Sequence, residues 1–488
     1  LGEDALAVLA DVFAGDPDFP ERSAAILLRE TIRAQLEDAR GAALAMRDEA
    51  DRIRGRDDAL EFALLSEAAV AAMLGADVPL CLALASRAAD AARDEGRRTM
   101  ARALRGYAAV HRGDGGDADA IAAMEQLGAL DPDALGDDAL TLLQLAGWVL
   151  MVRERRDEAE RVLRGLTRSA LRRGHTTAQA FASVVLAEIG FRRGRWLDAL
   201  TDATFDIALR ESRAVSRGTL GFAVAAHVFA HLGERAHCEQ RAAQALAYAE
   251  RVGLWSIAAF ARAALGASAL AHGDAAGALA ELRRVWEIRQ RGGVASANVV
   301  WYHGDFVEAL LATRDLALAA EVVDEVGREA DATGLAWPRA VAARGRALLG
   351  QGAPEDAIAA AVAADAPFEL ARTRLVLVEH GRLGAEAAGL RDALQTFERL
   401  GARPWAARAR DRLGARGESP PSLAQLLTDA ELRVAMLVGR GATNAAAGEQ
   451  LVISVRTVDA HLRSIFRKLG IKSRSELVLR VATEGGRR

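Results

Sequence analysis

The sequence predicts an all-α protein that consists of a long α-solenoid followed by a small C-terminal domain of four helices. Three observations lead to this prediction. Ala, Leu and Arg dominate the 488 residues, whereas aromatic residues make up only 5% and proline occurs ten times, a composition that favours helices. A pattern of small residues repeats about every 40 positions through most of the chain. This period stops near residue 413, and a basic segment with a different pattern follows.

The repeat is marked by a small residue near the start of a helix, five positions after a short turn. The spacings between successive marks are 40, 39, 40, 41 and 38 residues. The marks are Ala159, Ala199, Cys238, Ala278, Ala319 and Ala357. A small residue at this place lets the two helices of a unit approach closely.

A second set of marks consists of glycines that close polar runs and precede further apolar-periodic segments. These are Gly174, Gly253, Gly293 and Gly334. Because glycine at such a position is typical of a helix C-terminus, each unit is predicted to be a pair of helices. A pair of this size cannot bury its own apolar face, so we expect the pairs to stack into a superhelix with an extended concave groove.

The period resembles that of tetratricopeptide repeats, whose usual unit of 34 residues is lengthened here to about 40. Surfaces of this kind commonly bind something, so the expected occupant of the groove is a small-molecule or protein effector. The alternative is a helical array that holds nothing in its groove.

The extent of the repeat and a change of composition after it divide the chain into four parts. Residues 1–56 are predicted to form a helical N-terminal segment, and residues 57–413 the tetratricopeptide-like repeat domain. The stretch 414–424, in a region rich in Gly, Pro and Ser, is the predicted linker to a C-terminal domain at 425–488. Residues 421–488 contain eleven Lys and Arg against six Asp and Glu, a net charge of +5, while residues 1–420 carry about −9.

The C-terminal segment has the layout of a helix-turn-helix. Thr428 is the predicted N-cap of a first helix that ends near Gly441, and a second short helix follows over about 443–451. Ser454 and Ser473 are the predicted caps of a third and a fourth helix.

The third predicted helix has two different sides. Its apolar side, drawn at 100° per residue, consists of Val458, Leu462, Ile465 and Leu469. Its opposite side consists of Arg456, Ala460, Arg463 and Arg467. A cationic row after a tight turn favours a helix that enters the major groove of DNA; the alternative is a solvated basic face. His461, at the edge of the apolar side, is expected to pack within the domain rather than to read a base.

The stretch 427–481 resembles the LuxR-type helix-turn-helix of bacterial transcription factors. The positions that match the pattern of this family are Leu427, Thr428, Glu431, Gly441, Asn444, Leu451, Ile453, Ser454, Thr457, Val458, His461, Leu462, Lys468, Leu469, Gly470, Ser473, Arg474, Glu476 and Leu477. The segments PFELARTRLVLVEHG and LQTFERLGARPWAARARDRLGARG also resemble the end of the sensor region in large, MalT-like members. The resemblance implies a transcriptional regulator that binds double-stranded promoter DNA as a homodimer, with helix 473–483 as a candidate contact and RNA polymerase as a further partner.

In this family the third helix reads bases, so the resemblance assigns base contacts to Asp459, Ala460 and Arg463. It assigns phosphate contacts to Asn444, Arg456, Thr457, Arg467, Lys468, Ser473 and Arg474. Chemistry agrees for most of these, because Arg463 can donate two hydrogen bonds to guanine, Ala460 can touch a thymine methyl group and the flanking arginines can neutralise phosphates. Asp459 stands where many members have Lys. It could accept from N4 of cytosine but would repel a phosphate, so a different base preference is expected.

Other departures from the family pattern concern the first and second helices of the domain. Ala446, Ala447 and Gly448 stand where Glu, then Ile or Val, then Ala are usual, and Ala430 stands where Arg is common. Gly in a helix costs about 1 kcal/mol relative to Ala, which predicts a weakened second helix. These departures motivate an alternative, a helical-repeat scaffold protein with a decayed helix-turn-helix.

Several other classes of function have no motif in the sequence. MalT-like regulators typically carry a nucleotide-binding module with a P-loop; either it has been lost upstream of Leu1, or the protein works without it. The absence of HExxH, GxSxG and Cys/His clusters leads us to expect no enzymatic activity, metal or cofactor. The two widely separated cysteines, Cys81 and Cys238, and the lack of a bilayer-length apolar stretch predict a cytoplasmic protein without membrane contact.

Overall fold

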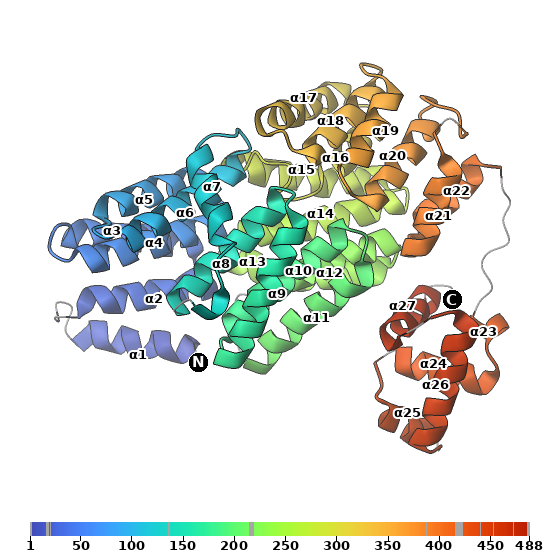
Figure 1. Cartoon of the computed structure of the whole chain (residues 1–488), viewed down its shortest axis with the longest axis horizontal. Coiled ribbons are helices and arrows are strands. Elements are labelled where there is room, and N and C mark those ends of the chain that lie inside the picture. Colours follow the sequence, from blue (N-terminus) through green and yellow to red (C-terminus); the bar gives the residue numbers. More distant parts are fainter. Residues whose placement is uncertain are drawn as a thin grey trace.

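The computed structural model describes residues 2–15, 19, 21–134, 137–213, 219–386, 388–414, 423–439, 441–451, 453–471 and 473–485. Across these ranges every regular element is a helix, and the predicted all-α class is confirmed. Figure 1 shows α1–α22 as one array of helices packed side by side in chain order, and α23–α27 as a separate small bundle. None of the helices in the described ranges has the length and apolar character needed to cross a bilayer.

The helices of the array are separated by short turns. They are α1 (Gly2–Gly15), α2 (Arg22–Leu36), α3 (Ala39–Ile53), α4 (Asp58–Leu74), α5 (Val78–Ala91), α6 (Glu95–Arg112), α7 (Ala118–Leu127), η1 (Pro132–Ala134), α8 (Asp137–Val152), α9 (Arg156–Arg173), α10 (Thr176–Arg192), α11 (Trp196–Arg213), α12 (Thr219–Leu232), α13 (Arg235–Val252), α14 (Trp255–Ala271), α15 (Ala275–Gly292), α16 (His303–Ala312), α17 (Leu316–Thr333), α18 (Ala336–Leu349), α19 (Pro354–Ala363), α20 (Pro367–Glu379), α21 (Leu390–Leu400) and α22 (Arg403–Arg412). The bundle comprises α23 (Leu423–Leu426), α24 (Asp429–Gly439), α25 (Asn444–Leu451), α26 (Val455–Leu469) and α27 (Arg474–Gly485).

The repeat marks lie at equivalent places in the fold, which confirms the predicted helical repeat. Each is the fourth residue of its helix, in α9, α11, α13, α15, α17 and α19. All six are fully buried: Ala159, Ala199, Cys238, Ala278, Ala319 and Ala357. The four marker glycines follow α9, α13, α15 and α17 and have φ between 69° and 71°. A left-handed residue without a Cβ ends a helix at little cost, so these glycines help to set the unit length.

Aspartates determine where several helices begin. In six of the described helices, the carboxylate of the residue before the first turn accepts a hydrogen bond from a free backbone N–H of that turn, which stabilises the helix start. These caps are Asp38, Asp57, Asp77, Asp94, Asp274 and Asp315.

Helices that are far apart in the sequence are in contact, because the superhelix returns upon itself. α2 packs against α13, α4 against α14, and α12 against α22. The hydroxyl of Tyr248 in α13 donates to the carbonyl of Gln35 in α2, and the guanidinium of Arg403 in α22 pairs with Glu234 at the start of α13. A solenoid ordinarily keeps contacts between neighbouring repeats, so these links between turns are an addition to the predicted architecture.

The apolar residues after Gly293 do not form a helix at once, in contrast to the expected apolar-periodic segment. α15 ends at Gly292, α16 begins only at His303, and most of the intervening segment, 294–302, is buried. We call residues 294–302 the capping segment, because they donate hydrogen bonds to carbonyl groups at the ends of other helices.

The capping segment satisfies carbonyl groups at helix ends. The backbone N–H groups of Ala295 and Ser296 donate to the carbonyl of His111, in the last turn of α6, at 2.9 and 3.0 Å. The side-chain amide of Asn298 donates to the carbonyl of Val152, the last residue of α8, at 3.1 Å. Such carbonyls have no partner within their own helix, so helix ends more than a hundred residues earlier in the chain hold this segment in a non-helical conformation.

A group of charged side chains is buried where α16 and α20 meet. Arg372 of α20 is 1% exposed and lies 2.8 Å from Asp305, 2.9 Å from Glu308 and 3.6 Å from Glu369. Burial by itself would lower the pKa of Arg372, but the three carboxylates raise it well above its ordinary value. The guanidinium also lies over the ring of Trp405, 4.8 Å from its centroid. The cation is therefore enclosed on several sides.

The C-terminal bundle has a hydrophobic core of its own. The core consists of Leu423, Leu427, Val434, Ala435, Val438, Ala447, Val458, Leu462, Ile465, Leu477 and Val481. Most of the predicted linker, at 415–422, lies outside the described residues. Leu423, at the end of the predicted linker, already belongs to this core.

Candidate nucleic-acid interface

The third predicted helix, α26, starts where the sequence predicts, directly after Ser454. Ser454 has an extended backbone, and its Oγ accepts a hydrogen bond from the N–H of Thr457 at 3.1 Å. After Leu469 the chain turns at Gly470, whose φ is 66° and whose N–H donates to the carbonyl of Phe466. Both ends of the helix are thus stabilised by local contacts.

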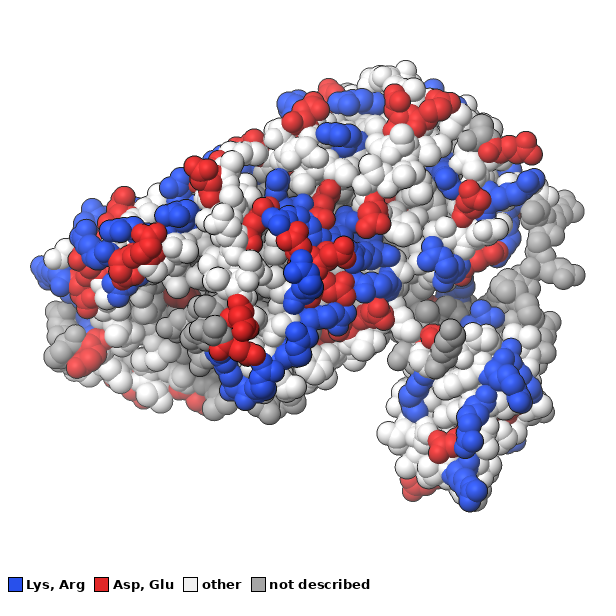
Figure 2. Space-filling model, in the orientation of Figure 1, with Lys and Arg blue, Asp and Glu red and all other residues white. Residues whose placement is uncertain are grey.

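One side of α26 is anchored in the core, and the other side is exposed. Val458 and Ile465 are fully buried, and Leu462 is nearly so. The four residues of the predicted cationic row are all exposed: Arg456, Ala460, Arg463 and Arg467. Their spacings of four, three and four residues place them on one helix face. Figure 2 shows Lys and Arg side chains crossing the C-terminal bundle in a line.

Asp459, a predicted base contact, is half-buried and bonded within the domain. Its Oδ1 accepts a hydrogen bond from Nδ2 of Asn444, the first residue of α25, at 2.6 Å. Oδ1 of Asn444 accepts in turn from Nη1 of Arg474, the first residue of α27, at 2.7 Å. Side chains of three helices therefore form one chain of hydrogen bonds, which we call the Arg474–Asn444–Asp459 triad.

The triad lies in a cleft of about 360 Å³ beside α26. The cleft is lined by Asn444, Asp459, Leu462, Arg463, Phe466 and Arg474. Two predicted phosphate contacts, Asn444 and Arg474, meet here although they are 30 residues apart. Ser473, a third, caps α27 by accepting a hydrogen bond from the N–H of Glu476 at 3.2 Å. The cleft thus brings two arginines and one aspartate to the same side of the domain.

Lys468, another predicted phosphate contact, forms an ion pair inside the domain. Its Nζ lies 2.6 Å from Oε2 of Glu431 in α24. Glu431 also accepts from Oγ of Ser464 at 2.7 Å and from the N–H of Thr428 at 2.8 Å. The side chain of Lys468 is 35% exposed, so it links α26 to α24 and still reaches the surface. Its contact with a phosphate stays a prediction.

Thr428 and Glu431 form a capping box at the start of α24, in which each side chain bonds the backbone N–H of the other. Thr428 is therefore the helix start that the sequence predicts. The hydrogen bond from Lys468, followed by that from the Thr428 N–H, lowers the pKa of Glu431 to about 2. The sequence pattern Thr-x-x-Glu predicts the cap. The bonds of Glu431 to α26 join residues that are more than 30 positions apart, so no local sequence pattern predicts them.

Changing Glu431 to glutamine is expected to lower the Tm of the isolated domain 421–488 by roughly 5 °C at pH 7, because charge-assisted hydrogen bonds are lost. The pKa of Glu431 falls from its usual 4.5 to about 2 on folding, so its stabilisation is present above about pH 4.5 and disappears as the pH falls toward 2. Circular dichroism melts at pH 7 and pH 3 measure this. Glu449→Gln, at an exposed position on α25, is the control and should leave the Tm unchanged. A difference between wild type and Glu431→Gln that stays as large at pH 3 would contradict the assignment.

The second helix of the bundle forms in spite of its small residues. α25 runs from Asn444 to Leu451, and Ala447 is fully buried in the core. A Cβ on Gly448 would lie 2.8 Å from the backbone oxygen of Ile453, in the turn before α26. The glycine therefore permits the helix and the turn to approach closely. This packing role explains why a residue of low helix propensity stands at this position.

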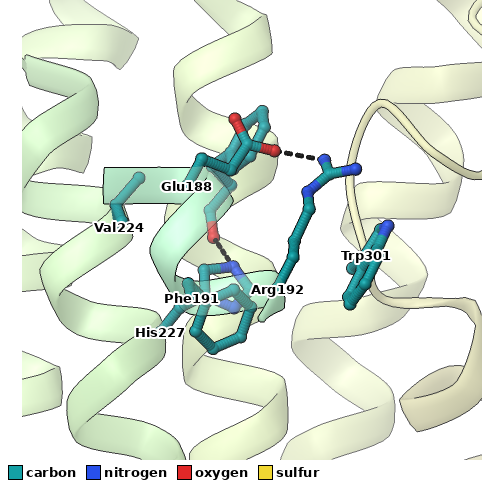
Figure 3. Close-up of a pocket in the computed structure, with 7 residues that line it drawn as sticks. Glu188, Phe191, Arg192, Val224, His227 and Trp301 are labelled. Carbon is teal, nitrogen blue, oxygen red and sulfur yellow. Dashed lines mark hydrogen bonds and ion pairs between the residues drawn. The ribbon is translucent and has the colours of Figure 1, made fainter. Parts of the chain in front are cut away.

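In the repeat region, a small cavity lies beside a buried ion pair. Figure 3 shows its lining residues, which are Glu188, Phe191, Arg192, Val224, His227, Phe260 and Trp301. Arg192 pairs with Glu188, and its guanidinium lies 4.7 Å from the ring centroid of Trp301, a residue of the capping segment. The cavity measures about 10 Å³, which is space for one water molecule. This cavity is too small for a larger ligand in the present conformation, and an effector in the groove stays a prediction.

Comparison with known families matches residues 425–481 to the family described as "Bacterial regulatory proteins, luxR family". The "Oxygen regulatory protein NreC" of Staphylococcus aureus strains JH9 and JH1 is 43% identical over 54 residues, which are 11% of this chain and 25% of the relative. The chain thus spans about a quarter of the length of these curated relatives. Among solved structures, a Rap protein complexed with Competence and Sporulation Factor matches with 12% identity and a TM-score of 0.42, covering 72% of this chain and 96% of that chain. The C-terminal bundle is a LuxR-family helix-turn-helix domain, as the sequence resemblance predicts.

Proposed function

We propose that the protein is a transcriptional regulator that binds double-stranded promoter DNA through its C-terminal domain, with α26 in the major groove. The observation that carries this proposal is the exposed row of Arg456, Ala460, Arg463 and Arg467 on a helix whose other side is anchored in a core. Three arginines provide donors for phosphates and base edges, and the small alanine leaves room for close approach. The family match of this domain to bacterial regulatory proteins supports the same function.

The residues divide into two proposed roles. Base contacts are assigned to Asp459, Ala460 and Arg463. Phosphate contacts are assigned to Asn444, Arg456, Thr457, Arg467, Lys468, Ser473 and Arg474. The second set lies along α26 and at the N-termini of α25 and α27, where the helix dipoles favour an anion.

The helical repeat region is assigned a sensory role, with a small-molecule or protein effector as its ligand. The protein is proposed to act in the cytoplasm as a homodimer on DNA, with RNA polymerase as a further partner. Val478 on α27 is 36% exposed, which offers an apolar contact for a second copy of the domain.

The full chain is expected to bind selected fragments of its genomic DNA with an affinity that falls steeply with salt. Four of the proposed phosphate contacts are cationic, so log K should fall against log [salt] with a slope of roughly −4 per subunit. Titrations by fluorescence anisotropy at several salt concentrations measure the slope. If no DNA fragment is retained at moderate salt, the proposal is wrong.

A second candidate function is a helical-repeat scaffold whose helix-turn-helix has decayed, motivated by Ala446, Ala447 and Gly448. A thermal melt of residues 421–488 separates the two, because the scaffold requires an unfolded or molten domain and the regulator a cooperative transition. The burial of Ala447 in the core favours the regulator.

A further inference from the structure

We propose that Asn444 is a positioning residue, which fixes the carboxylate of Asp459 so that this carboxylate discriminates one base of the target, a cytosine. This inference rests on the proposed DNA-binding function and adds to it the origin of part of the base specificity. It arises from the Arg474–Asn444–Asp459 triad.

The neighbours of Asn444 determine how its amide is oriented. A guanidinium only donates hydrogen bonds, and an ionised carboxylate only accepts them. The amide oxygen of Asn444 therefore faces Arg474, at 2.7 Å, and its NH₂ group faces Asp459, at 2.6 Å. An aspartate of the same size at this position could pair with Arg474 but could not donate to Asp459. Asparagine thus meets both requirements at once.

This bond leaves one oxygen of Asp459 for an outside donor. Oδ1 is occupied by Asn444, whereas Oδ2 has no hydrogen-bond partner among the residues that the structure describes. Asp459 precedes Arg463 by one helical turn, and both line the cleft beside α26. An acceptor held beside the proposed base-reading arginine suits the N4 amino group of cytosine. With Oδ1 fixed, less side-chain freedom is lost when Oδ2 meets the base.

The triad also reduces an electrostatic conflict. Asp459 is an anion on a side of the domain that is proposed to approach phosphates, which it would repel. The amide of Asn444 donates to this carboxylate and accepts from the cation of Arg474, and the two groups offset part of the negative charge. The approach of Asp459 to DNA therefore costs less electrostatic free energy than that of an isolated carboxylate.

The experiment compares the sequences that the full chain selects from a pool of random DNA with those selected by three variants, Asn444→Ala, Asp459→Ala and the double variant. The wild type is expected to prefer cytosine at one position. Each single change should reduce this preference about tenfold, as the loss of one good base contact does. The double change should reduce it no further, because both residues act through the same contact. Glu449→Ala, exposed on α25, is the control and should leave every preference unchanged.

The outcomes separate the two proposals. If the wild type selects no sequence, the DNA-binding function itself fails. If the wild type shows a preference that Asn444→Ala leaves intact, or if Asn444→Ala weakens all sequences equally, the positioning role is overturned. Should alanine unfold the domain, Asn444→Asp takes its place: it retains a partner for Arg474 but repels Asp459, and the proposal requires the same loss of preference.

Discussion

Replacing Arg372 with alanine is expected to lower the free energy of unfolding of the repeat region by about 3–5 kcal/mol at neutral pH, as for a buried ion pair that loses one partner. Asp305 and Glu308 would lose the cation that lies 2.8 and 2.9 Å away, whereas Glu369 would keep Arg344 at 2.8 Å. The pKa of Asp305, which burial already raises against the opposing effect of Arg372, should then rise further. The penalty should therefore grow as the pH increases above about 4, the ordinary carboxyl pKa. Urea unfolding followed by tryptophan fluorescence at pH 5 and pH 8 measures both effects.

Arg374→Ala is the matched control for this change, because it removes an arginine from the same helix. Its partner Asp392, at 3.3 Å, has a side chain that is 72% exposed. Exposed ion pairs contribute about 0–1 kcal/mol, so a small loss is expected. Equal losses for the two variants would show that burial of the charge group is not what stabilises the array.

Arg463→Ala is expected to weaken binding to the selected promoter sequence by about 1–3 kcal/mol and to relax the choice of base at one position. Arg463 is exposed in the middle of the cationic row, and its guanidinium can donate two parallel hydrogen bonds to O6 and N7 of guanine. Fluorescence anisotropy with the selected sequence and with its single-base variants measures both the affinity and the base preference.

Arg467→Ala provides the comparison, because Arg467 is exposed on the same face one turn later. As a proposed phosphate contact, it should weaken binding to all sequences about equally and reduce the salt slope by about 1. The assignment of Arg463 to a base would be contradicted if its variant retained every base preference of the wild type.

The features that could be predicted from the sequence are those that depend on contacts within one helix or turn. Ser454 and Thr428 cap helices by bonding groups three residues away, so their roles follow from local spacing. The buried repeat marks, such as Ala159 and Ala278, could be predicted because each unit places a small residue at the same point, where its neighbouring helices approach closely. The fold class and the helix-turn-helix therefore followed from the sequence.

The features that could not be predicted depend on contacts across the fold. The capping segment follows Gly293, where a further helix was expected, but the carbonyl of His111 accepts hydrogen bonds from the N–H groups of Ala295 and Ser296 and holds them in a non-helical conformation. In the C-terminal domain, the family resemblance assigned Asn444 and Asp459 to separate roles, whereas the structure joins them by a hydrogen bond. Whether each residue contacts a base or a phosphate is still a prediction.

The links between turns of the superhelix change how the repeat region can move. A solenoid without such links resembles a spring, which can lengthen by small rotations between units and can unravel from either end. Here Tyr248 and Gln35, Ser256 and Leu74, and Arg403 and Glu234 join positions 213, 182 and 169 residues apart. Stretching would break these bonds together, so we expect the array to behave as one stiff block. Under the sensory role proposed for the repeat region, a signal would then reach the C-terminal domain through displacement of the whole block rather than through bending from repeat to repeat.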